Sequence, residues 1–96
     1  MRVYLGTDAA GLRALLAGEP LTGERVAPES DDEQDEFDAL STAADDGPVV
    51  VTAEVEQPDD AVTLDLVAAL HVDADGTGDL AWYGVQELQA VIALLP

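Results

Sequence analysis

The 96-residue sequence predicts one α+β domain over residues 1–96, with a mixed sheet of about four or five strands and about three helices packed on it, in the order β-α-(β)-α-β-β-β-α. Three observations predict this class. Short runs rich in β-branched residues recur along the chain, apolar residues between them repeat at helical spacing, and glycines and prolines separate the segments. Apolar residues make up 48% of the chain, which is enough for a hydrophobic core.

The first part of the chain is expected to form a strand, a helix and a short edge strand. Residues 2–5 have the pattern of a strand, and Gly6 ends it. Thr7 or Asp8 can then cap a helix by accepting hydrogen bonds from the N–H groups of its first turn. Residues 24–27 are expected to form the edge strand. Three leucines at helical spacing predict the side of the helix that packs on the sheet: Leu12, Leu15 and Leu16.

The second expected helix begins in the most acidic segment, residues 29–38. Ser30 followed by Glu33 matches a capping box, which predicts Ser30 as the N-cap. Apolar positions at i, i+3 and i+7 predict a narrow buried stripe on this helix: Phe37, Leu40 and Ala44. We interpret the carboxylates of the segment as a solvated helix face, and the functional alternative is an acidic docking face.

The second part of the chain is expected to contain three strands and a last helix. The β-branched run at 49–55 predicts a central strand with both faces partly covered. Residues 63–66 are expected to form a turn or a brief helical piece. The runs at 67–72 and 80–83 predict a hairpin, and residues 85–95 have helical spacing.

The net charge of −18 is the strongest compositional signal, with 21 carboxylates against three arginines and no lysine. Such a chain repels itself at low ionic strength, whereas about 1 M salt shortens the Debye length to roughly 3 Å. The composition therefore predicts a protein adapted to the cytoplasm of a halophile. An acidic mimic of nucleic acid and a cation buffer are the alternatives. Direct binding of nucleic acid is not expected, because three arginines cannot form a basic stripe.

Compartment and cofactors are predicted mainly by what the sequence lacks. There is no cysteine, which excludes disulfides, thiolate metal sites and thiol nucleophiles. Residues 1–5 lead into a strand pattern, unlike a signal peptide, and no apolar run approaches the roughly 20 residues that span a bilayer. We expect a cytoplasmic protein that binds no cofactor and no membrane.

The loop at residues 73–79 resembles a fragment of a calcium-binding loop. Its carboxylates form a weak metal candidate: Asp73, Asp75 and Asp79. However, placing Gly76 at the glycine position of an EF-hand puts His71 first and Trp82 twelfth, where carboxylates belong. A polar hairpin loop without a metal is therefore expected.

A candidate functional surface lies around the expected hairpin: His71, Asp73, Trp82, Tyr83, Gln86 and Glu87. His71 is the one histidine, and we expect it to be a structural, hydrogen-bonded residue, with general-base catalysis as the alternative. The adjacent rings of Trp82 and Tyr83 should point to opposite faces of the sheet, one into the core and one away from it.

The last helix is apolar around most of its circumference. Its apolar face is a candidate for self-association as a homodimer: Leu88, Val91, Ile92 and Leu95. The alternative is burial of this face against the chain's own sheet.

Six runs, in order and over roughly half the chain, resemble a family of small proteins known mainly from actinobacteria and described only as a domain of unknown function. The runs are 1–5 (MRVYL), 11–16 (GLRALL), 36–40 (EFDAL), 49–55 (VVVTAEV), 67–73 (VAALHVD) and 82–88 (WYGVQEL). This chain is shorter between the two late strands and more acidic than the family. The resemblance implies an α/β domain without an assigned activity, and it draws attention to His71, Trp82, Tyr83, Gln86 and Glu87.

Taken together, the sequence predicts a non-enzymatic protein-interaction module adapted to high salt, with an unknown partner or a second copy of itself. Two alternatives stay open. One is an enzyme or small-ligand binder that uses His71 with Asp73, Trp82, Tyr83 and Glu87. The other is an acidic mimic that blocks a nucleic-acid-binding protein.

Overall fold

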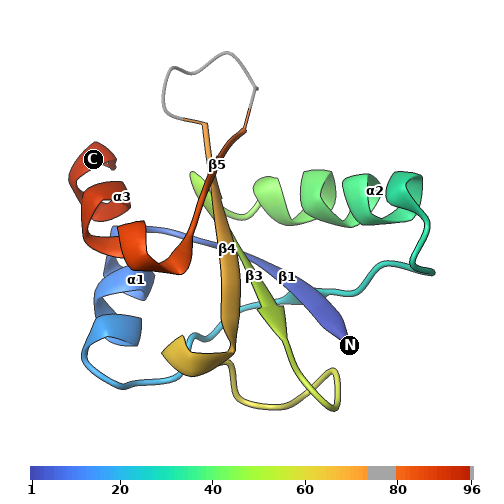
Figure 1. The fold of residues 1–96 in the computed structure, drawn as a ribbon, viewed down its shortest axis with the longest axis horizontal. Helices are drawn as coiled ribbons and strands as arrows, with labels where there is room; N and C mark the ends of the chain where they lie inside the picture. Colours follow the sequence, from blue (N-terminus) through green and yellow to red (C-terminus); the bar gives the residue numbers. More distant parts are fainter. Residues whose placement is uncertain (74–79, 96) are drawn as a thin grey trace.

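A five-stranded sheet with helices on both faces forms the fold in the computed structural model of the protein, which describes residues 1–73 and 80–95 (Figure 1). The strands are β1 (Arg2–Thr7), β2 (Arg25–Val26), β3 (Val49–Glu54), β4 (Val67–Val72) and β5 (Ala81–Tyr83). The helices are α1 (Ala9–Leu16), α2 (Glu33–Ala44) and α3 (Leu88–Leu94), with short 3₁₀ turns η1 (Leu64–Leu66) and η2 (Val85–Glu87). The predicted α+β class and order of elements are confirmed.

The sheet has the strand order β2-β1-β3-β4-β5, and each neighbouring pair is antiparallel. The central position of β3 and the β4–β5 hairpin are as predicted, but the expectation of a mixed sheet is wrong. Both β2 and β3 run antiparallel to β1, so they point in the same direction. The connection through α2 therefore joins β2 to β3, two strands of the same direction, as a helical crossover does. The two strands are not paired with each other, because β1 lies between them in the sheet.

One face of the sheet is covered by α1 and α3 (Figure 1). Its core joins residues of both helices to the inward side chains of the central strands, among them Leu12, Leu15, Leu88, Val51 and Leu70. The predicted stripe of α1 is correct for Leu12 and Leu15. It is wrong for Leu16, whose side chain is exposed, and Ala9 at the start of the helix is buried instead.

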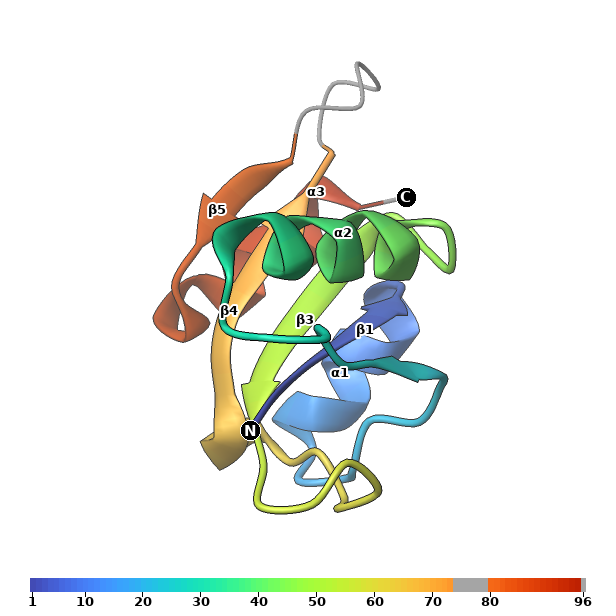
Figure 2. The same ribbon diagram turned by 90° about the vertical axis from the view of Figure 1, so that its right-hand side faces the viewer.

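The opposite face, which we call the α2 face, is covered by α2 where it crosses β1 and β3 (Figure 2). Ala39 and Ala43 are buried there against Tyr4 and Val50. The predicted stripe is therefore wrong at its first residue: Phe37 is 60% exposed. Two alanines one turn apart let the helix approach the sheet closely, and a phenylalanine ring would hold it further away.

The helix caps follow local hydrogen bonding. Asp8 caps α1, as predicted, and its carboxylate accepts from the Gly11 N–H at 3.0 Å. The cap of α2 is Asp32 and not Ser30, because the Asp32 carboxylate accepts from the Gln34 N–H at 2.9 Å. Ser30 instead accepts from the Asp32 N–H and stabilises the turn that precedes the helix. Within the described residues, no helix has both the length and the apolar character needed to cross a bilayer.

Candidate functional site

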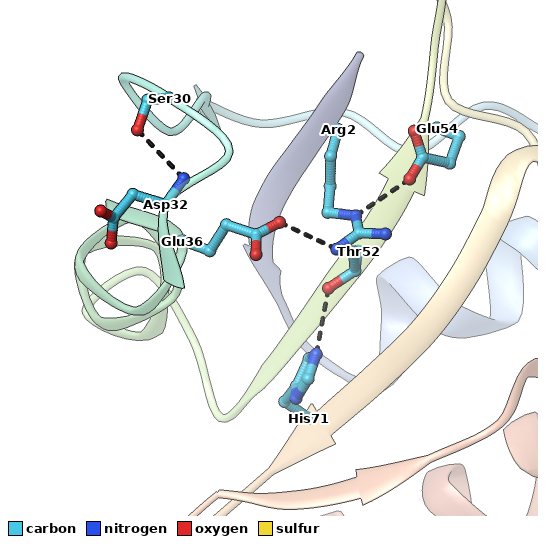
Figure 3. Close-up of polar contacts among 7 residues, drawn as sticks. All are labelled: Arg2, Ser30, Asp32, Glu36, Thr52, Glu54 and His71. Atoms are coloured by element: carbon cyan, nitrogen blue, oxygen red, sulfur yellow. Dashed lines mark hydrogen bonds and ion pairs between the residues drawn. The ribbon is translucent and has the colours of Figure 1, made fainter. Parts of the chain in front are cut away.

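His71 lies in β4 between the two residues that pair with it across the sheet, Val50 of β3 and Trp82 of β5. Its neighbours Leu70 and Val72 belong to the core under α1 and α3, so the imidazole points to the α2 face. His71 Nε2 and Thr52 Oγ1 are joined by a hydrogen bond of 3.0 Å (Figure 3). The prediction of a hydrogen-bonded histidine is confirmed.

The surroundings of His71 favour a neutral imidazole. The ring is partly buried, and this burial lowers the pKa of His71 below its ordinary value because the charged form loses water. Its hydrogen-bond partner is a hydroxyl, which compensates an imidazolium charge less than a carboxylate would. The pair therefore fixes the position of the ring on the sheet surface.

Folding stability is expected to fall below pH 6.5 because of His71. Because folding lowers the pKa of His71, the unfolded chain binds a proton at this imidazole more readily than the folded chain does. The stability that depends on a neutral His71 is therefore fully present above the unfolded pKa of about 6.5, and it is lost as the pH falls through the folded pKa. In urea unfolding in molar KCl, the folding free energy should decrease as the pH is lowered from 6.5, by at most about 1.4 kcal/mol per pH unit, and His71→Gln should remove this part of the decrease. Equal slopes for the two proteins between pH 6.5 and 5 would rule this out.

The two adjacent rings of β5 lie on opposite faces of the sheet, as predicted. Trp82 stands opposite His71, so both side chains share the α2 face, and Trp82 is 65% exposed. Tyr83 stands opposite Leu70 and packs against the core on the other face. The sequence-predicted surface is therefore divided, with His71 and Trp82 together and Tyr83 on the other face.

The side of α2 that carries Phe37 faces the β4–β5 hairpin. Ser41 and Ala44, one and two turns further along that side, line a surface hollow of about 410 Å³ together with Asp73 and Leu80 at the base of the hairpin. The opposite side of α2 lines a second hollow of about 250 Å³ beside β2. Phe37 and Trp82 are thus exposed aromatic residues on the same face of the sheet.

We name the four residues Phe37, Leu40, His71 and Trp82 the Phe37–Trp82 surface. Leu40 is partly buried at the edge of the small core beneath α2, and His71 is half-buried. The aromatic pair is the unusual feature, because the chain has four aromatic residues and two of them lie largely in solvent. The spacing of Phe37, Leu40 and Ala44 predicted that Phe37 is buried. The alternative stripe of Ala39 and Ala43 was the available signal against it.

An ion-pair network lies beside this surface (Figure 3). Arg2 of β1 contacts Glu36 of α2 and Glu54 of β3, each at 2.9 Å, and so links three elements. The hydrogen bond that Arg2 donates to the Glu54 carboxylate is the main reason why the pKa of Arg2 is raised. One guanidinium shared by two carboxylates leaves this part of the surface negatively charged.

The remaining predicted site residues do not join this surface. Gln86 and Glu87 are exposed in η2, which leads into α3 on the other face. Asp73 follows β4 at the base of the hairpin, and Asp75 and Asp79 lie outside the described residues. Among the residues that the structure describes, no cluster of three or more His, Asp or Glu side chains could hold a metal ion.

The apolar face that was predicted for self-association packs against the chain's own core. Leu88 and Val91 are buried in the main core, and Ile92 and Leu95 pack against it. This arrangement corresponds to the alternative of burial against the sheet. A second copy of the folded chain would have little access to Leu88 and Val91.

Four carboxylates of the acidic segment 29–38 have structural partners. Asp32 caps α2, Asp35 accepts from the Ser30 hydroxyl, Glu36 pairs with Arg2, and Asp38 accepts from the Gln34 amide. These contacts favour the interpretation of the segment as a solvated, locally stabilised helix face.

Comparisons with known proteins add no function. No family model matches the chain, and no curated protein or solved structure is similar to it at a significant level. The resemblance to the actinobacterial family stays a prediction, and function has to be inferred from the geometry described above.

Proposed function

We propose that the protein is a non-enzymatic protein-interaction module that works in molar salt and binds its partner through the Phe37–Trp82 surface. The observation that carries this proposal is the exposure of two aromatic side chains, 60% for Phe37 and 65% for Trp82, on the same face of the sheet. Tryptophan and other aromatic residues dominate the binding energy of protein interfaces, because they bury a large area with few rotatable bonds.

The nature of the neighbouring groups supports binding over catalysis. His71, the histidine available as a general base, is hydrogen-bonded to a threonine hydroxyl. It lines none of three hollows that open on the described surface. An apolar, aromatic surface next to a fixed imidazole suits a protein contact.

Partner capture in molar KCl tests this function. The double variant Phe37→Ala/Trp82→Ala is expected to lose captured partner from a lysate of the source cells at least tenfold, since central aromatic anchors contribute about 2 kcal/mol or more. Both residues are exposed, so the folding free energy should change by only about 0.5 kcal/mol.

Leu94→Ala is the matched control, because Leu94 is 49% exposed on α3, on the other side of the sheet. This variant is expected to capture the same proteins as the wild type. Undiminished capture by the double variant would refute the assignment of the surface.

A further inference from the structure

The α2 face of the sheet has space for one more helix. Strands lie about 4.8 Å apart and a packed helix is about 10 Å wide, so one helix covers about two strands. The opposite face of this five-stranded sheet has two helices, α1 and α3. On the α2 face, α2 covers β2, β1 and β3 through Val26, Tyr4 and Val50.

Over β4 and β5, the side chains on the α2 face are those of Ala69, His71 and Trp82. Ala69 is small and buried, His71 is half-buried, and Trp82 is largely exposed. Phe37 borders this area from the side of α2, because it lies one helical turn before Ser41, which lines the hollow at the base of the hairpin. Leu40 is partly buried beneath the same helix. The uncovered area therefore has an aromatic floor and an apolar border. Among the described residues, no helix packs on these two strands from the α2 face.

The charges around the area select the type of helix. Glu36 and Glu54 share the single guanidinium of Arg2, so a negative excess remains beside Thr52 and His71. The whole chain has a net charge of −18. A helix with carboxylates on its flanks would be repelled here, whereas arginines or lysines would meet opposite charges at contact distance.

We propose that the uncovered area over β4 and β5 binds an amphipathic helix of a partner protein, with an apolar stripe on Trp82 and Phe37 and basic residues on its flanks. The inference rests on the proposed function and adds the chemistry and secondary structure of the partner. It corresponds to helix-in-groove recognition, in which residues at i, i+3, i+4 and i+7 anchor the helix.

Three synthetic peptides of about 18 residues without tryptophan test this inference. The first has leucines at i, i+3, i+4 and i+7 and arginines on both flanks. The second replaces the arginines with glutamates, and the third keeps the composition of the first but scrambles the leucines. Trp82 is the single tryptophan, so its fluorescence in 1 M KCl reports burial of the surface directly.

The arginine peptide is expected to shift Trp82 emission to shorter wavelength, and its Kd should rise about tenfold or more in Phe37→Ala but not in Leu94→Ala. The glutamate and scrambled peptides should bind about tenfold more weakly than the arginine peptide. If the glutamate peptide binds as tightly as the arginine peptide, the predicted charge of the partner is wrong. If the scrambled peptide does so, the predicted amphipathic helix is wrong.

Two further outcomes would overturn this inference while leaving the proposed function intact. One is the absence of any peptide-induced shift when lysate capture still depends on Phe37 and Trp82. The other is a shift of Trp82 emission with protein concentration alone, accompanied by a dimer mass in light scattering, which would make a second copy the occupant.

Discussion

Gly6→Ala is expected to destabilise the protein by about 3 kcal/mol and to lower its melting temperature by more than about 10 °C. A Cβ atom at residue 6 would lie 2.1 Å from the carbonyl oxygen of Ala43 and 2.8 Å from Cβ of Asp46. Both obstacles belong to the end of α2 and the turn after it, so α2 would have to move off the sheet. The intrinsic gain from removing a glycine in a strand, about 0.5–1 kcal/mol, is smaller than this cost.

Gly84→Ala provides the control for this prediction. The three atoms nearest to the new Cβ all belong to the Gln86 side chain, which can rotate away, and the backbone angle φ of −76° suits any residue. Thermal melts followed by circular dichroism in molar KCl should show a large loss for Gly6→Ala and little change for Gly84→Ala. Similar melting temperatures for the two variants would mean that α2 does not pack on β1 as described.

Removal of salt is expected to unfold the protein. Two like charges 10 Å apart repel by about 0.4 kcal/mol in water, and a net charge of −18 creates many such pairs within a molecule whose radius of gyration is 12.1 Å. Their sum at low ionic strength is comparable with a folding free energy of about 5–15 kcal/mol. In the described part of the chain, Arg2 forms the two ion pairs that offset this repulsion.

Melting temperatures measured from 10 mM to 3 M KCl should therefore rise with salt, most steeply below about 1 M, where screening changes most. Neutralising three exposed carboxylates, in Glu24→Gln/Glu29→Gln/Asp31→Asn, should reduce the KCl needed for folding. A melting temperature that is independent of KCl would contradict salt adaptation. It would favour a function for the carboxylates, such as imitation of nucleic acid.

Sequence periodicity was sufficient for the elements but not for their arrangement. The β-branched run of β3 predicted a central strand with both faces partly covered, because alternation and side-chain shape are local properties. The pairing of β1 with both β2 and β3 depends on where the chain returns after each helix, which no local pattern encodes. The stripe of α2 failed for a similar reason, because the closeness of α2 to Gly6 selects alanines over Phe37.

The candidate site shows the same limit. Alternation along β5 correctly separated Trp82 from Tyr83, and the choice of which ring enters the core follows from the pairing of Trp82 with His71. The hydrogen bond between His71 and Thr52 joins two strands, so the identity of the partner requires the β3–β4 register. Phe37 became part of the surface only through the orientation of α2.

The insertion of β1 between β2 and β3 has a consequence for the order of events during synthesis. Arg2 and Glu54, which pair across β1 and β3, are 52 residues apart in the chain, and β3 begins past its midpoint. During synthesis β1 therefore emerges long before its main partner β3, whereas β3, β4 and β5 follow one another along the chain and can pair as they emerge. Pairing between strands so far apart in the sequence slows folding. Until β3 is available, Val3 and Leu5 of β1 are exposed, so the nascent chain relies on charge repulsion to avoid aggregation.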